Sequence, residues 1–385
     1  MSEEKKLTEL SFDSLDIKEN ILRGIYAYGF EKPSIIQHKA IPIINSGKDI
    51  IAQAQSGTGK TGAFSIGVLN NIDFSLNETQ VIILSPTREL SSQIFNVVTE
   101  LSSYTDLKLC KVVGGTNIRE SIYELRKNPH IIIGTPGRVL DMLSKHHIYT
   151  SKLKSIVIDE ADETLSQGFQ EIIYNIFGYL PKKAQVCLFS ATFPEQLFEL
   201  AEKIMNNPEK ILVNKEELTL EGISQYYINV KTHNWKYDVL TDIYNSINIT
   251  QCIIYINSKN RLFEIYTALN EQGYPVGMIH GGLNNDERNL TMEQFRSGEI
   301  RIILSTDLLA RGIDIQQLSL VINYDLPIEK ETYIHRIGRS GRYGRKGVVI
   351  NFITDKDMDK VNELQTYYNT KIEVMPENIA EIISV

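Results

Sequence analysis

The sequence predicts an α/β protein built from two parallel-sheet domains, and three observations carry this prediction. Short runs rich in Ile and Val alternate with longer helix-period segments along the whole chain. Most of these runs end at Gly, Pro, Ser or Asp, which is typical of buried parallel strands joined by crossover helices. The length of 385 residues suits two or three domains of about 150 residues each.

The expected strands fall into two sets along the chain, each apolar enough to be covered by helices on both faces. The runs of the first half are Asp49–Gln53, Val81–Leu84, Lys111–Val113, His130–Ile133, Ser155–Ile158, Gln185–Phe189 and Lys210–Val213. Those of the second half are Gln225–Val230, Cys252–Ile256, Pro275–Ile279, Ile300–Leu304, Leu320–Asn323 and Gly347–Phe352. Between the two sets lies the polar stretch KEELTLEG. We therefore expect a first domain over residues 1–214, a linker over 215–222 and a second domain over 223–385.

Composition excludes several classes of protein. The chain has 40 Lys and Arg against 48 Asp and Glu, a net charge of −8, which excludes a uniformly basic nucleic-acid-binding surface but not a local basic groove. No apolar run approaches the roughly 18 residues of a membrane span, and the first residues do not resemble a signal peptide. The three cysteines are far apart, which argues against a disulfide framework or a zinc site. We expect a soluble protein in a reducing, intracellular compartment.

Residues of special chemistry directly follow the strand runs of the first half. They are Gly57–Lys60, Pro86–Arg88, Gly114-Gly115, Thr135–Arg138, Asp159-Glu160 and Ser190–Thr192. In open α/β sheets the ligand crevice lies beyond the carboxyl ends of the strands. The sequence therefore predicts an active site at this edge of the first sheet.

The stretch AQSGTGKT, residues 54–61, indicates a phosphate-binding loop. It follows a strand, opens a helix and fits the pattern GxxxxGK[ST], except that Ala54 replaces the first glycine. In such a loop the backbone N–H groups wrap the phosphates at a helix N-terminus, Lys60 reaches the β- and γ-phosphates, and the Thr61 hydroxyl binds Mg²⁺. The backbone contacts would come from Ser56, Gly57, Thr58 and Gly59. The alternative is an incidental Gly-rich turn.

Two adjacent acids complete the expected nucleotide site. Asp159 ends a buried hydrophobic strand, as the Mg²⁺-coordinating Asp does beside a phosphate-binding loop. The next carboxylate, Glu160, is placed to orient and deprotonate the water that attacks the γ-phosphate. The alternative is a pair of solvated loop acids.

Residues 159–162 spell DEAD, and with the other motifs they resemble the DEAD-box family of ATP-dependent RNA helicases. In family order the chain contains GFEKPSIIQ, AQSGTGKT, PTREL, GG, TPGR, DEAD, SAT, STD, ARGID and HRIGRSGR. The resemblance covers nearly the whole chain from Phe12. It implies two RecA-like domains that bind ATP and RNA, hydrolyse ATP and unwind short RNA duplexes.

The resemblance also implies a role for individual residues. Gln37 reads the adenine, Phe30 stacks on it and Lys32 lines the pocket; taken alone, Phe30 would be a core residue and Gln37 a surface one. Asp314 binds the ribose or stabilises a closed state, and His335 couples to the ATP side. Arg339 and Arg342 stabilise charge on the γ-phosphate, although the basic cluster around them could instead be a solvated surface facing RNA. Ser190, Thr192 and Asp162 are placed to link ATP binding to domain closure. The hydroxyls of Ser190 and Thr192 are expected to hydrogen-bond to both Asp159 and Asp162.

The RNA-binding residues are also assigned by resemblance. In the first domain they are Pro86, Thr87, Arg88, Gly114, Gly115, Thr135, Gly137 and Arg138. In the second they are Asn257, Gly281, Arg288 and Thr306. Glycine loops and helix N-termini suit backbone recognition, so binding should be largely independent of base sequence. For any single Thr or Gly, an ordinary turn role is an equal alternative.

Within the family the chain is most similar to the branch that acts in translation initiation. Residues 21–34, 216–222 and 319–327 resemble that branch and its exon-junction relative; residues 307–317 are closer to the former and 339–345 to the latter. We expect a cytoplasmic, monomeric RNA helicase of translation initiation with an initiation-factor scaffold as partner. The alternative is an ATP-gated RNA clamp of the exon-junction type in the nucleus, and a DNA-directed helicase is disfavoured. Trp235 is expected to be a packing residue and not a base-stacking platform.

Overall fold

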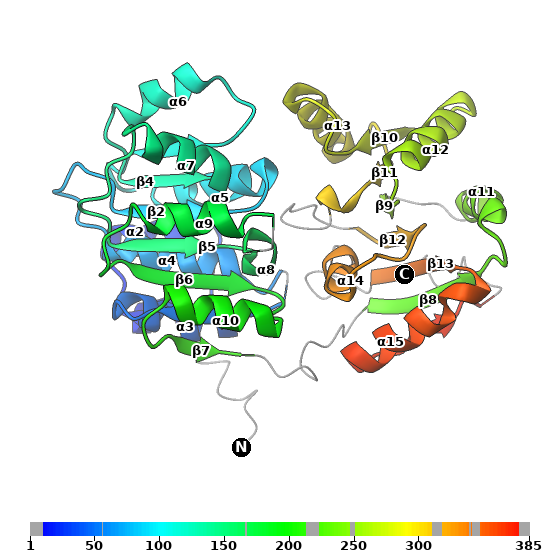
Figure 1. Cartoon of the computed structure of the whole chain (residues 1–385), viewed down its shortest axis with the longest axis horizontal. Helices are drawn as coiled ribbons and strands as arrows, with labels where there is room; N and C mark the ends of the chain where they lie inside the picture. The colour runs from blue at the N-terminus through cyan, green and yellow to red at the C-terminus, as the bar shows by residue number, and fades with distance from the viewer. Residues whose placement is uncertain are drawn as a thin grey trace. The chain divides into compact units, whose positions relative to one another are not determined.

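The computed structural model describes residues 11–55, 57–165, 168–212, 223–246, 251–309, 318–338, 340 and 347–376. The chain divides into two compact units, residues 1–213 and 214–385 (Figure 1). Within the described residues, no helix has the length and apolar character needed to cross a membrane.

The first unit is built on a seven-stranded sheet with the order β3-β4-β2-β5-β6-β1-β7. Every pair of neighbouring strands in it is parallel. Its strands are β1 (Ile50–Gln53), β2 (Val81–Leu84), β3 (Leu109–Val112), β4 (Ile131–Gly134), β5 (Ser155–Ile158), β6 (Gln185–Ser190) and β7 (Glu209–Ile211). Because all strands run the same way, the loops that follow them meet at one edge.

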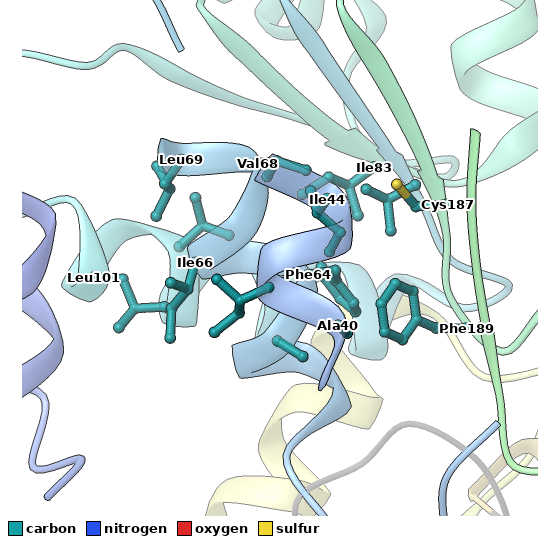
Figure 2. Close-up of a cluster of buried hydrophobic side chains, with 14 of the residues drawn as sticks. Ala40, Ile44, Phe64, Ile66, Val68, Leu69, Ile83, Leu101, Cys187 and Phe189 are labelled. Carbon is teal, nitrogen blue, oxygen red and sulfur yellow. The ribbon is translucent and has the colours of Figure 1, made fainter. Parts of the chain in front are cut away.

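Helices cover both faces of this sheet, because successive strand residues point to opposite sides. Ile50 and Ala52 of β1 belong to one core cluster and Ile51 to the other. Figure 2 shows the first cluster, in which the rings of Phe64 and Phe189 lie 5.3 Å apart. The helical segments of this unit are η1 (Phe12–Leu15), α2 (Glu19–Ala27), α3 (Ile35–Asn45), α4 (Lys60–Asn71), α5 (Arg88–Leu101), α6 (Ile118–Leu125), α7 (Pro136–Ser144), α8 (Ala161–Thr164), α9 (Gln170–Phe177) and α10 (Glu195–Ile204).

The second unit repeats this architecture with a seven-stranded sheet of order β10-β11-β9-β12-β13-β8-β14. Its strands are β8 (Ile223–Asn229), β9 (Cys252–Tyr255), β10 (Val276–Ile279), β11 (Ile302–Ser305), β12 (Leu320–Asn323), β13 (Gly347–Ile353) and β14 (Glu373–Val374). Its helical segments are η3 (His233–Trp235), α11 (Lys236–Ser246), α12 (Lys259–Glu271), α13 (Asn285–Ser297), η4 (Asp307–Leu309), α14 (Lys330–Ile337), η5 (Asp355–Asp357) and α15 (Met358–Tyr368). Two parallel sheets, each between layers of helices, are the architecture that the sequence predicts.

Apart from strand ends, two details differ from the prediction. The short edge strand β14 was not predicted, because its two exposed residues carry no apolar run. The expectation that Trp235 is a packing residue is wrong, since its side chain is 61% exposed on η3. The three cysteines, by contrast, are free and buried, with Cys110 and Cys187 in the first sheet and Cys252 in the second.

Candidate active site

The phosphate-binding loop connects β1 to α4. Gly57 and Gly59 have positive φ angles of 84° and 101°, which glycine adopts without steric cost. The buried Lys60 ammonium donates to the Ala54 carbonyl at 2.6 Å, and the Thr58 hydroxyl donates to the Gln55 carbonyl at 2.7 Å. Lys60 and Thr61 are the first two residues of α4, and a helix N-terminus favours the binding of phosphate. Ser56 lies outside the described residues.

The Gln37 side chain joins helix α3 to this loop. Gln37 is buried and completes a capping box, in which its Oε1 accepts from the Ser34 N–H at 2.9 Å. Its Nε2 donates to the Gly59 carbonyl at 3.3 Å. An amide group has two N–H donors and two acceptor lone pairs, so these bonds leave capacity for the edge of an adenine. Lys32 precedes this helix and is exposed.

The ring of Phe30 is held from several sides. Phe12 stacks on it with centroids 6.3 Å apart, and Tyr28 meets it edge-on at 4.8 Å. Gly62 of α4 also packs here, since a Cβ added to it would lie 2.6 Å from Gln37 Nε2 and 3.0 Å from Phe30 Cε2. The sequence motif did not single out Gly62, which only the close packing of α3 against α4 makes important.

We expect Gly62→Ala to weaken ATP binding by about tenfold, because overpacking costs about 1–3 kcal/mol when neighbours must move. Titration calorimetry of the full chain with ATP measures this. Gly168→Ala is the matched control, since its added Cβ meets nothing within 4 Å. Unchanged ATP affinity in Gly62→Ala would show that Phe30 and Gln37 do not form the base pocket.

Asp159 and Glu160 follow β5 and are both buried. Burial, followed by the negative charge of Glu160, raises the pKa of Asp159 to about 7, although Lys60 acts in the opposite direction. The Asp159 carboxylate accepts from the Glu160 N–H at 3.0 Å. Glu160 has a positive φ of 45°, a conformation that is costly for a residue with a Cβ and is found most often at functional sites. The alternative of two solvated acids does not fit this burial.

The residues after β6 hold Asp162. The Ser190 hydroxyl donates to Asp162 Oδ1 at 2.7 Å and the Thr192 hydroxyl to Oδ2 at 2.6 Å. Both hydroxyls donate to the same carboxylate, so a movement of the chain at the end of β6 would also displace Asp162 of α8. For Asp159, the structure gives bonds to other groups. Its carboxylate accepts from the Glu160 N–H, its carbonyl accepts from the Thr164 hydroxyl at 2.8 Å, and its N–H donates to the Leu84 carbonyl at 2.9 Å.

The predicted RNA-binding loops of the first unit lie along the same edge. The Thr87 hydroxyl caps α5 by accepting from the Leu90 N–H at 3.2 Å. Arg88 lies against the two glycines after β3, and the Thr135 hydroxyl accepts from the Gly114 N–H at 3.2 Å. Pro86 directly precedes Thr87. Arg138 donates to the Thr116 carbonyl at 3.1 Å, and Gly137 has open space where a Cβ would be.

Gly115→Ala is expected to weaken RNA binding by about tenfold while leaving ATP affinity unchanged. Gly115 has a φ of +73°, and an added Cβ would lie 2.2 Å from Arg88 Nη1, so the guanidinium must move. Loss of one phosphate contact should also reduce the salt slope of RNA affinity by about one unit. Fluorescence anisotropy at several salt concentrations measures both. Gly273→Ala is the control, because its φ of +81° is also left-handed and its added Cβ would meet nothing within 4 Å.

In the second unit a buried arginine, Arg336 of α14, organises the predicted site. Its guanidinium donates to Asp307 Oδ1 at 2.6 Å, to the Asp325 carbonyl at 2.6 Å and to Asn257 Oδ1 at 2.6 Å. It also donates to Asn323 Oδ1 of β12 at 3.2 Å. Arg336 is 0% exposed, so it belongs to the core and not to a solvated basic surface. Nothing in the sequence distinguishes it from the neighbouring arginines.

Asp325 forms the centre of a second group of bonds in this unit. Its carboxylate accepts from the buried Lys236 ammonium at 3.0 Å, from Arg261 at 3.0 Å and from the Asn257 N–H at 3.2 Å. Burial alone would raise the pKa of Asp325, but these donors outweigh it and the pKa is lowered. Asn257 Nδ2 also donates to the Leu326 carbonyl at 2.8 Å, so the amide predicted to contact RNA is tied within its own unit.

The other predicted residues of the second unit are placed as follows. Arg288 of α13 is buried and donates to the Gly281 carbonyl at 3.1 Å, which brings these two predicted RNA-binding residues together. Thr306 follows β11, and its carbonyl accepts from the Ser305 hydroxyl at 2.7 Å. His335 lies in the last turn of α14. Asp314, Arg339 and Arg342 lie outside the described residues.

Comparison with known proteins decides the family. A model of the DEAD/DEAH box helicases matches residues 34–200, and one of the helicase conserved C-terminal domain matches residues 235–344. The ATP-dependent RNA helicase eIF4A of Kluyveromyces lactis is 53% identical, covering 97% of this chain and 94% of that protein. The chain belongs to the DEAD/DEAH box helicase family. Eukaryotic initiation factor 4A of Caenorhabditis elegans is 49% identical, with 97% and 93% covered.

Solved structures of DEAD-box helicases agree. S. cerevisiae Dbp5 bound to RNA and ADP BeF3 matches with a TM-score of 0.92 and 36% identity, covering 97% of this chain and 98% of that one. Mss116p bound to ssRNA and AMP-PNP matches with a TM-score of 0.86 and 28% identity, covering 98% and 80%. The predicted fold class, two RecA-like parallel-sheet domains, is confirmed, as is the predicted class of enzyme, an ATP-dependent RNA helicase.

Proposed function

We propose that this DEAD-box helicase unwinds short RNA duplexes in translation initiation, using ATP. The observation that carries the proposal is the match, at about half identity, to eIF4A proteins along 97% of the chain. The alternative, an RNA clamp of the exon-junction type, is not favoured by these relatives. The geometry around Lys60, Asp159 and Glu160 supports ATP hydrolysis as the chemical step.

Glu160 is the proposed general base. Its carboxylate accepts a proton from the attacking water, whose oxygen bonds to the γ-phosphorus as the bond to ADP breaks. Lys60 neutralises charge on the β- and γ-phosphates, and the N–H groups of the loop at residues 56–59 hold them. Gln37, Phe30 and Lys32 bind the adenine, which favours ATP over GTP.

The residues present fit a magnesium ion. Burial and the charge of Glu160 raise the pKa of Asp159, and a divalent cation relieves the cost of keeping such a carboxylate ionised. Thr61 and Asp159 would hold the ion, since hydroxyl and carboxylate oxygens are ligands that Mg²⁺ accepts. When bound, the ion supplies positive charge that stabilises the phosphates during transfer.

The second domain is proposed to complete the ATP site and to link it to RNA. By family resemblance, Arg339 and Arg342 stabilise charge on the γ-phosphate, Asp314 binds the ribose or stabilises the closed state, and His335 couples to the ATP side. The proposed linker is residues 215–222. The bonds from Ser190 and Thr192 to Asp162 support a coupling role, because they join the end of β6 to the segment that carries Glu160.

The proposed RNA site uses the loops described above, from Pro86–Arg88 to Thr135–Arg138 in the first domain and around Asn257, Gly281, Arg288 and Thr306 in the second. Backbone contacts carry no base information, so binding should be largely independent of sequence, and 2′-hydroxyl contacts should favour RNA over DNA. Because the chain has a net charge of −8, affinity without nucleotide should be weak at physiological salt.

The test of this function is ATP hydrolysis and strand displacement by the full chain. Single-stranded RNA should stimulate hydrolysis strongly, DNA of the same sequence weakly, and ATP but not GTP should support displacement from a short RNA duplex. Equal stimulation by RNA and DNA would contradict the proposal.

The partner, compartment and assembly state are also proposed: an initiation-factor scaffold, the cytoplasm and a monomer. Affinity capture of the tagged chain from its native cells tests these together. Recovery of an initiation scaffold and a cap-binding factor is expected. Recovery of exon-junction partners instead would favour a nuclear RNA clamp.

A further inference from the structure

The first unit has a large groove at the edge of its sheet opposite the nucleotide site. The loops that precede β1, β6 and β7 line it, together with α9 and α10. We call it the rear groove and define it by residues 47–49, 181–186 and 205–210; its volume is about 1400 Å³. Because the phosphate-binding loop lies at the other end of β1, a molecule in the rear groove leaves the nucleotide site accessible.

Aromatic side chains supply the apolar surface of the rear groove. Tyr174 and Phe177 of α9 and Phe198 of α10 line it, and Tyr174 is 38% exposed. Ile51 of β1 and Ile156 of β5 close its base but are 1% and 0% exposed, so a ligand does not reach them. Aromatic rings on two helices suit contact with one large apolar side chain of a ligand.

The loops around the groove are held in place by buried polar groups. The Asp49 carboxylate accepts from the Val186 N–H at 2.8 Å and from the Asn206 N–H at 2.6 Å. The Gln185 amide donates to the Ile44 carbonyl at 3.1 Å and to the Lys48 carbonyl at 2.6 Å. These bonds connect all three loops, so the groove is formed before a ligand arrives and binding costs little ordering.

The rim of the rear groove is positively charged, although the chain as a whole is negative. The acidic residues that line the groove are Asp49, Glu202 and Glu209. The Asp49 carboxylate accepts from backbone N–H groups, and Glu209 pairs with Lys48 at 2.8 Å. Of these three, Glu202 therefore remains to offset the charge of the other lysines. Four exposed lysines without an acidic partner among the described residues remain at the rim: Lys182, Lys183, Lys203 and Lys210. The Lys210 ammonium lies 5.5 Å from the centroid of the Phe198 ring. The rim therefore complements an acidic ligand.

We propose that the rear groove docks an acidic segment of a partner protein, with one aromatic or large aliphatic side chain inserted between α9 and α10. The lysines select the negative charge and the aromatic walls select the inserted side chain. A nucleic-acid strand would satisfy the lysines and stack a base on an aromatic ring, so the test includes an RNA as the competing occupant. The proposal is independent of the function proposed above.

The test uses a fluorescein-labelled peptide, EDEFEDE, and fluorescence anisotropy with the full chain at low salt. We expect saturable binding that is lost with the uncharged peptide QNQFQNQ and weakened with EDEAEDE. The double variant Lys182→Glu, Lys183→Glu should weaken binding by about tenfold or more, as expected when rim charges are reversed. Tyr174→Ser should weaken binding of EDEFEDE but not of EDEAEDE.

The matched control is Lys152→Glu with Lys356→Glu, two exposed lysines that do not line the groove and give the same change of charge. It should bind EDEFEDE with no more than a small loss. An equal loss in both double variants, or no binding by the wild-type chain, would overturn the proposal. It would also be overturned if the Lys182→Glu, Lys183→Glu variant lost affinity for labelled poly(U) RNA as it does for EDEFEDE, since nucleic acid would then be the occupant. If the lysine variant lacks the wild-type circular dichroism spectrum, Tyr174→Ser decides.

Discussion

Glu160→Gln is expected to reduce RNA-stimulated ATP hydrolysis by about 10²–10⁴-fold, the usual contribution of a general base. The amide retains the shape of the carboxylate but cannot take a proton from water. ATP binding should persist, because Lys60 and the glycine loop are unchanged. The substitution also removes the negative charge that raises the pKa of Asp159, so Asp159 stays ionised more readily for Mg²⁺.

Steady-state phosphate release and ATP titration separate these effects. Glu163→Gln changes the same chemical group within α8, the short helix of which Glu160 is the N-cap, and should keep near-wild-type turnover. Turnover of Glu160→Gln close to that of the wild type would show that another residue activates the water. Loss of ATP binding would instead assign Glu160 to nucleotide binding.

Arg336→Ala is expected to destabilise the second domain by about 3–5 kcal/mol, because it deletes a large buried side chain and leaves acceptors without a hydrogen bond. The side chain is 0% exposed, and its removal leaves acceptors on Asp307, Asp325 and Asn257 without their donor. Hydrogen exchange of the full chain, followed by mass spectrometry, should show faster exchange in β12 and β13. Strands of the first unit should be unaffected.

Two comparisons test the origin of that effect. Arg336→Lys keeps the charge but cannot reach all of these acceptors, so it should recover only part of the protection. Arg261→Ala removes a partner of Asp325 whose side chain is 42% exposed, and its cost should be about 1 kcal/mol or less. Equal exchange in wild type and Arg336→Ala would mean that the buried arginine does not hold the second sheet together.

Much of the fold was predictable because its strands are buried on both faces. Runs such as Ile82-Ile83 and Ile253-Ile254 have no polar face, so their pattern alone indicates a sheet between helices. Strand ends were less predictable. Strand β3 begins at Leu109, two residues before the predicted start, and exposed Lys111 lies inside it, because backbone pairing with β4 decides where an edge strand begins.

The candidate site was predictable where function depends on local sequence. Asp159 directly follows β5, and Lys60 follows the loop after β1, so the parallel topology brings both to one edge of the sheet. The polar groups around Arg336 were not predictable, because their partners come from separate segments and only tertiary packing buries them together. The same holds for Gly62, whose small size matters only because Gln37 and Phe30 lie against it.

The buried thiols give each domain its own chemical reporter of opening. Burial raises the pKa of the Cys110 thiol to about 12, and it also raises those of Cys187 and Cys252, so the reactive thiolate is scarce in the folded chain. Alkylation then requires a strand to leave its sheet. Since Cys110 and Cys187 lie in one sheet and Cys252 in the other, the labelling rates of these positions time the unfolding of the two domains separately within one unmodified molecule.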